Sequence, residues 1–169
     1  FAGISIIGEG HKITNCKFNH NGNLGISING SDTAHNWAPV PNRSPRNITL
    51  TANETSYNNY RKFELSWQHG GIKAAVSCNE ITVTNHKAMA NYGAGIWFDL
   101  YCRNINISRS TVKNNIVGIG YEISDQAVIA NNIVAGNKYH GIYIAASNGV
   151  KVVNNTLDDN GFGIVVHGL

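Results

Sequence analysis

Short segments of alternating apolar and polar residues recur along the whole chain at a nearly constant spacing. The segment from Gly141 to Ile144 is typical, because its residues alternate with the period of two that predicts a strand. Gly-Ile pairs begin such segments at Gly3, Gly25, Gly71, Gly95, Gly118, Gly141 and Gly163, with spacings of 22, 46, 24, 23, 23 and 22 residues. A second set of strands is predicted to begin at Ile13, Leu50, Val83, Ile107, Ile129 and Val152. The pattern therefore predicts two short strands in each repeat of 22–24 residues.

Composition favours the same β structure and predicts its turns. Charged residues make up 14% of the chain and glycine occurs 18 times, while Ile, Val and Thr are plentiful. Several strands end at an asparagine, namely Asn15, Asn85, Asn131 and Asn154. Because Asn and Gly tolerate left-handed backbone, we expect tight turns there and ladders of asparagine amides along the stack. Leucine-rich repeats have a similar period, but their leucine framework is absent.

Repeats of this kind, of the type GIxI…VxxxNxxxNN, resemble the right-handed parallel β-helix family, the pectate-lyase-like superfold. The resemblance covers essentially all 169 residues. It implies an all-β fold, a single-stranded right-handed parallel β-helix (solenoid) of about seven coils with two loop insertions. We expect residues 1–169 to form one domain, a fragment that lacks caps at both ends. The superfold hosts lyases, hydrolases, epimerases and phage tailspikes, so the resemblance alone does not select a function.

Stacked coils bring equivalent residues of neighbouring repeats together, about 4.8 Å apart. Alternation predicts that the central coils point Lys73, Trp97, Asp99, Glu122 and Tyr143 outward. Asp99 and Glu122 are each the fifth residue of a segment that begins Gly-Ile, which places them one above the other. Like charges opposed on neighbouring strands are unfavourable. Such a pair shares a proton, is neutralised by Lys73 or an arginine, or binds a metal; a solvated pair without function is the alternative.

Two departures from the even period are predicted to be loops beside this face. The chain carries extra residues between Ile28 and Ile48 and again between Asn53 and Gly71. Loops that interrupt a solenoid often build its binding site, and a loop without function is the alternative. The insertions supply His35, Trp37, Arg43, Tyr57, Tyr60, Arg61, Glu64, Trp67 and His69. We expect His69, and similarly His35, as an acid–base group, with Arg61 or Glu64 as a ligand or substrate clamp.

The resemblance implies two kinds of carbohydrate chemistry for these residues. As in polysaccharide lyases, Asp99 and Glu122 would hold Ca²⁺ against a uronate while Lys73 abstracts the α proton, and a C5 epimerase would begin in the same way. As in β-helix glycosidases, Asp99 and Glu122 would instead act as acid and base on a glycosidic bond. Lyase or epimerase chemistry ranks first because Lys73 shares the face. The three-aspartate pattern of polygalacturonases and the DPHD motif of alginate epimerases are both absent.

The expected partner is an extracellular polysaccharide, which the predicted substrate-binding residues Trp97, Tyr143, Trp67, Arg61 and Trp37 would contact. Ca²⁺ is the only cofactor expected, and the location is secreted, periplasmic or cell-surface. The net charge of +3 comes without a basic run, so we expect no nucleic-acid partner. No apolar stretch approaches the roughly 20 residues of a membrane helix, so we expect no membrane insertion. The rival hypothesis is a non-catalytic solenoid: a glycan-binding, tailspike-like or adhesin-like protein, or a structural stalk, with a homo-oligomer or larger assembly as a further option.

The cysteines suggest a structural role. Cys78 and Cys102 occupy the same place in successive repeats as Ser124 and Ser147 do in later ones. We expect a ladder of small turn residues with both thiols reduced, and a disulfide between them is the alternative. Cys16 is expected to be a buried free thiol, and no zinc-binding spacing is present.

Overall fold

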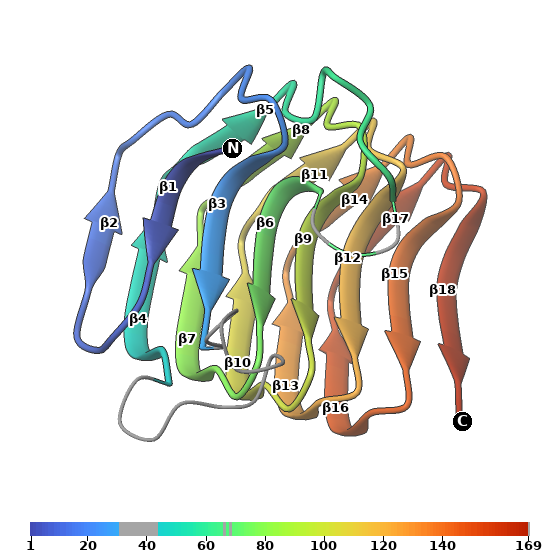
Figure 1. Cartoon of the computed structure of the whole chain (residues 1–169). Coiled ribbons are helices and arrows are strands. Elements are labelled where there is room, and N and C mark those ends of the chain that lie inside the picture. Colours follow the sequence, from blue (N-terminus) through green and yellow to red (C-terminus); the bar gives the residue numbers. More distant parts are fainter. Residues whose placement is uncertain (31–43, 66, 68, 169) are drawn as a thin grey trace.

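The chain forms one stack of coils with three parallel sheets (Figure 1). The computed structural model describes residues 1–30, 44–65, 67 and 69–168. The long sheet contains β1 (Ala2–Ile6), β3 (Leu24–Asn29), β6 (Gly70–Ala75), β9 (Ala94–Asp99), β12 (Val117–Glu122), β15 (His140–Ala145) and β18 (Phe162–His167). The second sheet contains β2 (Lys12–Thr14), β4 (Arg46–Thr51), β7 (Asn79–Thr84), β10 (Arg103–Ser108), β13 (Asp125–Ala130) and β16 (Asn148–Val153). The third sheet contains β5 (Glu54–Ser56), β8 (Lys87–Met89), β11 (Thr111–Lys113), β14 (Ile133–Ala135) and β17 (Thr156–Asp158).

Every strand pairs in parallel with the equivalent strand of the next coil, which confirms the predicted right-handed parallel β-helix of about seven coils. The Gly-Ile segments form the long sheet, and the second predicted set forms the second sheet. The third sheet is an addition, because the sequence pattern predicted two strands in each coil. Its strands are three residues long and point one side chain inward, such as Val112, so they are too short to show a period. No helix in the described part of the chain is long and apolar enough to cross a membrane.

The core lies inside the coils, where the inward columns predicted from alternation are buried. Ile72, Ile96 and Ile119 of the long sheet are fully buried in one column. The next inward column includes Phe98 and Tyr121, whose ring centroids are 6.4 Å apart. Burial of such side chains is the main stabilising contribution of a solenoid, because each coil covers the core of its neighbour.

Asparagine ladders follow the turns, as expected. The turn residues Asn15, Asn85, Asn131 and Asn154 all have positive φ angles, between 52° and 58°. One ladder consists of Asn21, Asn58, Asn91, Asn115, Asn137 and Asn160. Within it, Oδ1 of Asn115 accepts the backbone N–H of Asn91 at 3.0 Å and its Nδ2 at 2.9 Å. The ladder and the next strand explain the glycines of the Gly-Ile pairs from Gly3 to Gly141: a Cβ on Gly118 would lie 2.3 Å from the Gly141 carbonyl oxygen and 2.9 Å from Nδ2 of Asn137.

The predicted column of small turn residues is confirmed, with both thiols reduced. Cys78 and Cys102 are buried and free. The Cys102 backbone N–H donates to Oγ of Ser124 at 3.1 Å, and the Ser124 N–H donates to Oγ of Ser147 at 3.1 Å. The expectation for Cys16 was wrong, because this thiol is exposed near the N-terminal end of the stack, where fewer coils cover it.

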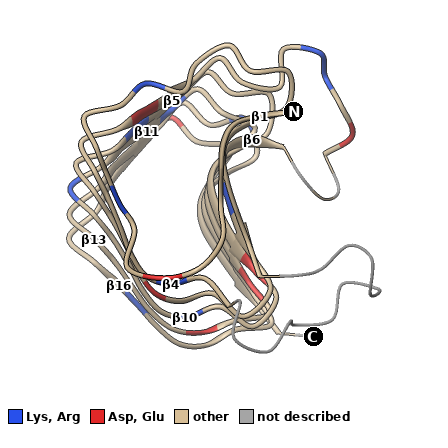
Figure 2. Cartoon of the chain, turned by 60° about the vertical axis from the view of Figure 1, so that its left-hand side comes forward, with Lys and Arg blue, Asp and Glu red and all other residues tan. Residues whose placement is uncertain are grey.

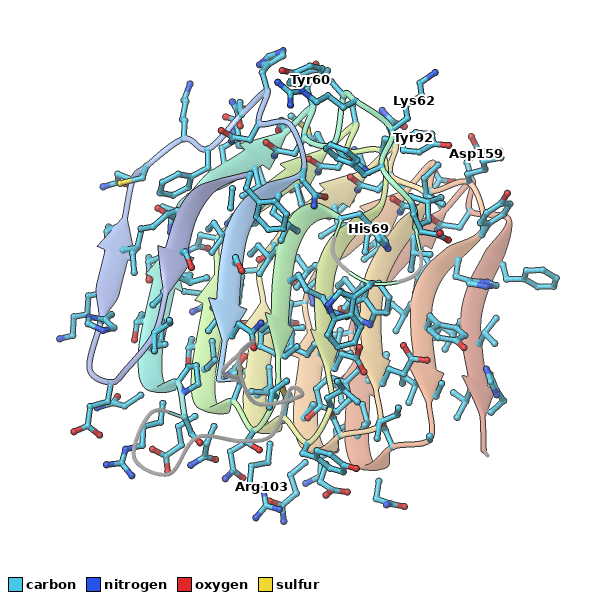
Figure 3. All side chains as sticks on the ribbon, viewed as in Figure 1. Tyr60, Lys62, His69, Tyr92, Arg103 and Asp159 are labelled. Atoms are coloured by element: carbon cyan, nitrogen blue, oxygen red, sulfur yellow. The ribbon has the colours of Figure 1, made fainter. Side chains whose placement is uncertain are left out.

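The segment between β5 and β6 is the insertion that shapes the long sheet. Figure 2 shows the chain leaving the stack after β5, projecting beyond the sheet that contains β1 and β6, and returning to it. Its end returns to the long sheet, and His69 lies over the outer face of that sheet (Figure 3). Leu65 and Trp67 line the same pocket as Trp97 of β9 and Glu122 of β12. The outward face is therefore partly covered.

Candidate functional site

A pocket of about 520 Å³ lies on the outer face of the long sheet, above β9, β12 and β15. The strands form its floor with their outward residues, and the end of the β5–β6 segment forms a wall. Its lining includes four aromatic side chains, two histidines, two carboxylates and several aliphatic side chains. The aromatic members are Trp67, Trp97, Tyr139 and Tyr143. A concave, largely apolar pocket with a few polar groups is the usual form of a ligand site.

The floor is open because a glycine separates two large aromatic residues. Gly120 lies between Trp97 and Tyr143, and its backbone is in register with both. A Cβ on Gly120 would lie 3.0 Å from Cδ1 of Trp97. The missing side chain therefore lets the Trp97 ring lie over β12 and leaves room between the two rings.

Lys73 and Asp99 form a buried ion pair beneath this floor. Nζ of Lys73 lies 2.7 Å from Oδ2 of Asp99, and the two residues are 2% and 4% exposed. The other oxygen of Asp99 accepts the Leu100 backbone N–H at 2.8 Å. The ammonium group also lies 3.2 Å from the Trp97 ring centroid and 5.1 Å from that of Trp67. Burial lowers the pKa of Lys73, and the charge of Asp99 opposes this change.

Glu122 is the carboxylate most open to the pocket, and its environment favours the protonated form. Partial burial raises its pKa first, and the negative charge of Asp99 raises it further. Lys73 and the indole N–H of Trp97 act in the opposite direction, but the net pKa is raised. The two carboxylates therefore differ: Asp99 is ion-paired with Lys73, whereas partial burial and the charge of Asp99 raise the pKa of Glu122.

His69 is held as a neutral ring against Trp97. It is 4% exposed, and the two ring centroids are 5.0 Å apart with an interplanar angle of 50°. The Ala94 backbone N–H donates to Nδ1 of His69 at 3.3 Å. Burial lowers the pKa of His69 to about 4, and the positive charge of Lys73 adds to this effect. Gly93 allows the His69 ring to lie close to the backbone, since a Cβ at position 93 would lie 2.2 Å from Nδ1 of His69.

A second aromatic group closes the C-terminal side of the pocket. The rings of His140 and Tyr143 are stacked, with centroids 5.2 Å apart and an interplanar angle of 15°. The Tyr143 hydroxyl is 2.7 Å from Nε2 of His167. Burial and the nearby His167 lower the pKa of His140, while burial and Glu122 raise that of Tyr143.

The structure brings most of the residues predicted from sequence together at this pocket. Asp99, Glu122, His69, Trp97, Tyr143 and Trp67 line it. Lys73 lies beneath it, packed against Trp97, and is not part of its lining. Trp37, His35 and Arg43 lie outside the described residues.

The positions of Asp99, Arg61 and Glu64 differ from expectation. We expected Asp99 on an exposed outward face, but it is 4% exposed and both of its oxygens are engaged, by Lys73 and the Leu100 N–H. Arg61 is exposed and lies 5.7 Å from the Tyr60 ring centroid, away from the pocket. Figure 3 shows its sequence neighbours Tyr60 and Lys62 at the edge of the molecule, whereas His69 lies over the long sheet. Glu64 is exposed in the same segment and is not part of the pocket lining either.

Sequence reasoning missed His140, Tyr139 and the aliphatic side chains of the pocket. His140 pairs in register with Val117, which pairs with Ala94, so the residues directly before Gly95, Gly118 and Gly141 form a column that lines the pocket. The equivalent position of these residues in successive repeats could have identified His140 from the sequence.

The expected Ca²⁺ ligands are only partly available. Both oxygens of Asp99 are engaged by Lys73 and the Leu100 N–H. Within the described ranges, no group of three or more His, Cys, Asp or Glu side chains converges to hold a metal ion. Because Ca²⁺ takes about six to eight oxygen ligands, Asp99 and Glu122 as arranged do not form a calcium site. A cation there would have to displace the ammonium of Lys73.

Comparison with known proteins supports the fold. A family model described as a right handed beta helix region matches residues 2–168. The chain matches no curated protein.

Proposed function

The chain belongs to the right-handed β-helix family, and on that premise we propose that it is a carbohydrate-active protein that binds a glycan in the pocket over β9, β12 and β15. Glu122 then acts as the general acid in cleavage of a glycosidic bond. One observation carries the proposal: a half-buried carboxyl with a raised pKa stands beside a second carboxylate that is held in an ion pair.

The shape of the pocket supports glycan binding. Sugar rings have an apolar face that stacks on aromatic side chains, and their hydroxyl groups need polar partners at the edge of the ring. Trp97 and Tyr143 stand on either side of Gly120 and provide such surfaces. Glu122 lies on the same strand as Gly120, which places a proton donor beside a bound ring.

The two carboxylates support acid catalysis. General acids that work near neutral pH have carboxyl groups with raised pKa values, and a second, ionised carboxylate stabilises the positive charge that develops on the sugar ring. Glu122 fits the first role, since burial and the charge of Asp99 both raise its pKa. Asp99 fits the second, since Lys73 and the Leu100 N–H stabilise its ionised form.

The geometry reverses the order in which the sequence ranked the reactions. A lyase or epimerase would use Lys73 as the base, but its ammonium is 2% exposed and 2.7 Å from Asp99. To abstract a proton, Lys73 would have to leave that pair and pass Trp97. Glycosidase chemistry needs no such movement, so we place it first.

A non-catalytic glycan-binding protein is the second candidate, and one observation favours it. Both oxygens of Asp99 already have donors, so among the described residues of the lining Glu122 is the carboxyl that is more open to a ligand. Such a site can bind a sugar without cleaving it.

The decisive experiment is Glu122→Gln assayed on a panel of neutral and acidic polysaccharides. The parent should release reducing ends, and the variant should lose at least about 100-fold in rate, because general acid catalysis contributes about 10²–10⁴-fold. Glu80→Gln is the control, since Glu80 is exposed on β7 of the second sheet. The parent activity should decline as pH rises through the raised pKa of Glu122, because the acid must be protonated.

The alternatives give different results. Unsaturated products from the parent would indicate elimination and return Lys73 to the role of base. Retention of a glycan by both the parent and Glu122→Gln, with no reducing ends released by either, would favour the binding protein.

A further inference from the structure

We propose that the pocket selects an uncharged sugar ring that carries a methyl group, as in a 6-deoxyhexose or an N-acetylated sugar, and rejects uronates. This inference rests on the proposed function and specifies its substrate class. Three features of the described pocket residues support it: the sign of the charges, the state of the histidines, and the aliphatic wall.

The charged groups of the lining are acidic. Asp99 and Glu122 supply carboxylates at the floor. The adjacent cation, Lys73, is 2% exposed and already neutralises Asp99 at 2.7 Å. A uronate carboxylate placed beside Glu122 would meet a like charge in a partly desolvated site, where repulsion is stronger than in water.

The two histidines of the lining offer no compensating positive charge near neutral pH. His69 is 4% exposed and packs against Trp97 with the two rings tilted by 50°, and burial lowers its pKa to about 4. His140 stacks on Tyr143, and burial lowers its pKa as well. Both rings are therefore neutral and contribute aromatic surface with hydrogen-bonding nitrogens.

The rest of the lining is suited to a methyl group. Aliphatic side chains from four segments line the pocket, namely Leu65 of the β5–β6 segment, Ile116 and Val117 at the start of β12, Leu100 directly after β9, and Ile123 directly after β12. Both ends of the pocket therefore have an apolar wall. A hexose hydroxymethyl group would lose hydrogen bonds to water against such a wall, whereas a methyl group would gain from burial. One methyl or methylene group in an apolar pocket changes affinity by roughly tenfold or more.

The experiment measures binding of three methyl galactosides that differ only at C6, by quenching of the fluorescence of Trp67 and Trp97. The probes are methyl D-fucoside, methyl D-galactoside and methyl D-galacturonide, with the corresponding gluco series as a second ring configuration. We expect the 6-deoxy sugar to bind about tenfold more tightly than the hydroxymethyl sugar, and the uronate most weakly. Comparison of the affinities for methyl N-acetylglucosaminide and methyl glucoside tests whether the pocket prefers the methyl group of an N-acetyl substituent or that of a 6-deoxy sugar.

Three variants assign the selectivity to its causes. Val117→Thr keeps the shape of the side chain and should reduce the preference for the methyl group without restoring uronate binding. Glu122→Gln should reduce the discrimination against the uronate and leave the preference for the methyl group intact. Val128→Thr is the control, because Val128 is exposed on β13 of the second sheet.

The outcomes separate this inference from the proposed function. Binding of the uronate as tightly as the neutral sugars overturns the inference and leaves glycan binding in place. Equal binding of methyl and hydroxymethyl sugars also overturns it. Absence of binding for every sugar in both series overturns the proposed function, and this inference with it.

Discussion

Substitution of Lys73 by methionine tests the buried ion pair on which the site is built. Methionine keeps most of the length and apolar volume of the lysine stem, so packing against Trp97 should largely persist. What is lost is the ammonium group that lies 2.7 Å from Oδ2 of Asp99. Asp99 then remains as a carboxylate that is 4% exposed, with the Leu100 N–H as its remaining donor among the hydrogen bonds described above.

The expected cost follows from this burial. Removing one partner of a buried pair leaves an uncompensated charge and costs about 3–5 kcal/mol. A surface pair would contribute about 0–1 kcal/mol. We therefore expect Lys73→Met to lower the free energy of unfolding by about 3–5 kcal/mol. Asp99→Asn should lower the free energy of unfolding by less. The amide oxygen still accepts the Leu100 N–H, and Lys73 can become neutral because burial already lowers the pKa of Lys73.

The assay is a double-mutant cycle with Lys73→Met, Asp99→Asn and the double variant. Urea unfolding is followed by far-ultraviolet circular dichroism, which reports the whole stack, and by tryptophan fluorescence, which reports Trp67 and Trp97 beside Lys73. The double variant carries no uncompensated charge, so it should recover most of the stability that Lys73→Met loses. The coupling between the two positions should exceed about 1 kcal/mol.

Two results would refute this reasoning. A loss below about 1 kcal/mol for Lys73→Met would mean that Asp99 is solvated as in a surface pair. Additive single effects would mean that the two side chains do not interact, and Asp99 would then have another source of stabilisation.

Two further predictions concern the ladders. Asn115→Ala removes the acceptor of the Asn91 backbone N–H and side-chain amide, so it should lower the free energy of unfolding in urea by at least about 2 kcal/mol. The control Asn106→Ala, on the exposed face of β10, should change it by less than about 0.5 kcal/mol. Equal effects of the two substitutions would show that the ladder adds no stability. His86 is buried beside Thr55, and burial lowers its pKa from 6.5 to about 3. The unfolded state therefore binds more protons between these values, so stability is fully present above pH 6.5 and falls as pH decreases toward 3. His86→Asn should reduce this acid sensitivity in urea titrations across that range, and an unchanged pH dependence would contradict the assignment.

The fold was predictable because its rules are local and repeat. Alternation decides which side chain of a strand points inward, so Phe98 and Tyr121, which neighbour the outward residues Trp97, Asp99 and Glu122, are buried in the core. The turn asparagines have the positive φ angles that their side chains tolerate. The same repetition placed Asp99 and Glu122 on adjacent strands, each directly after the paired residues Phe98 and Tyr121. The strands of the third sheet escaped prediction because a three-residue segment has no measurable period.

The candidate site was predictable only in part. Trp97, Asp99, Glu122 and Tyr143 belong to the repeat, so sequence alone gave their column and direction. Arg61 belongs to an insertion, and no period specified that it would lie beside Tyr60 and away from the pocket. The aliphatic wall combines segments that are far apart in sequence, so no local pattern indicates it.

The sequence by itself determined the coil, its inward and outward columns and the stacking of the two acids, because these follow from the period of the chain and from contacts between neighbouring repeats. The tertiary structure alone decided how the β5–β6 segment returns across the long sheet. That return brings the Trp67 ring centroid to 5.1 Å from Nζ of Lys73, adds Leu65 and Trp67 to the pocket that Glu122 lines, and sets His69 beside Trp97. The physical reason is that burial sets the charge state and reactivity of these groups, and burial depends on a loop whose position is fixed by contacts distant in sequence.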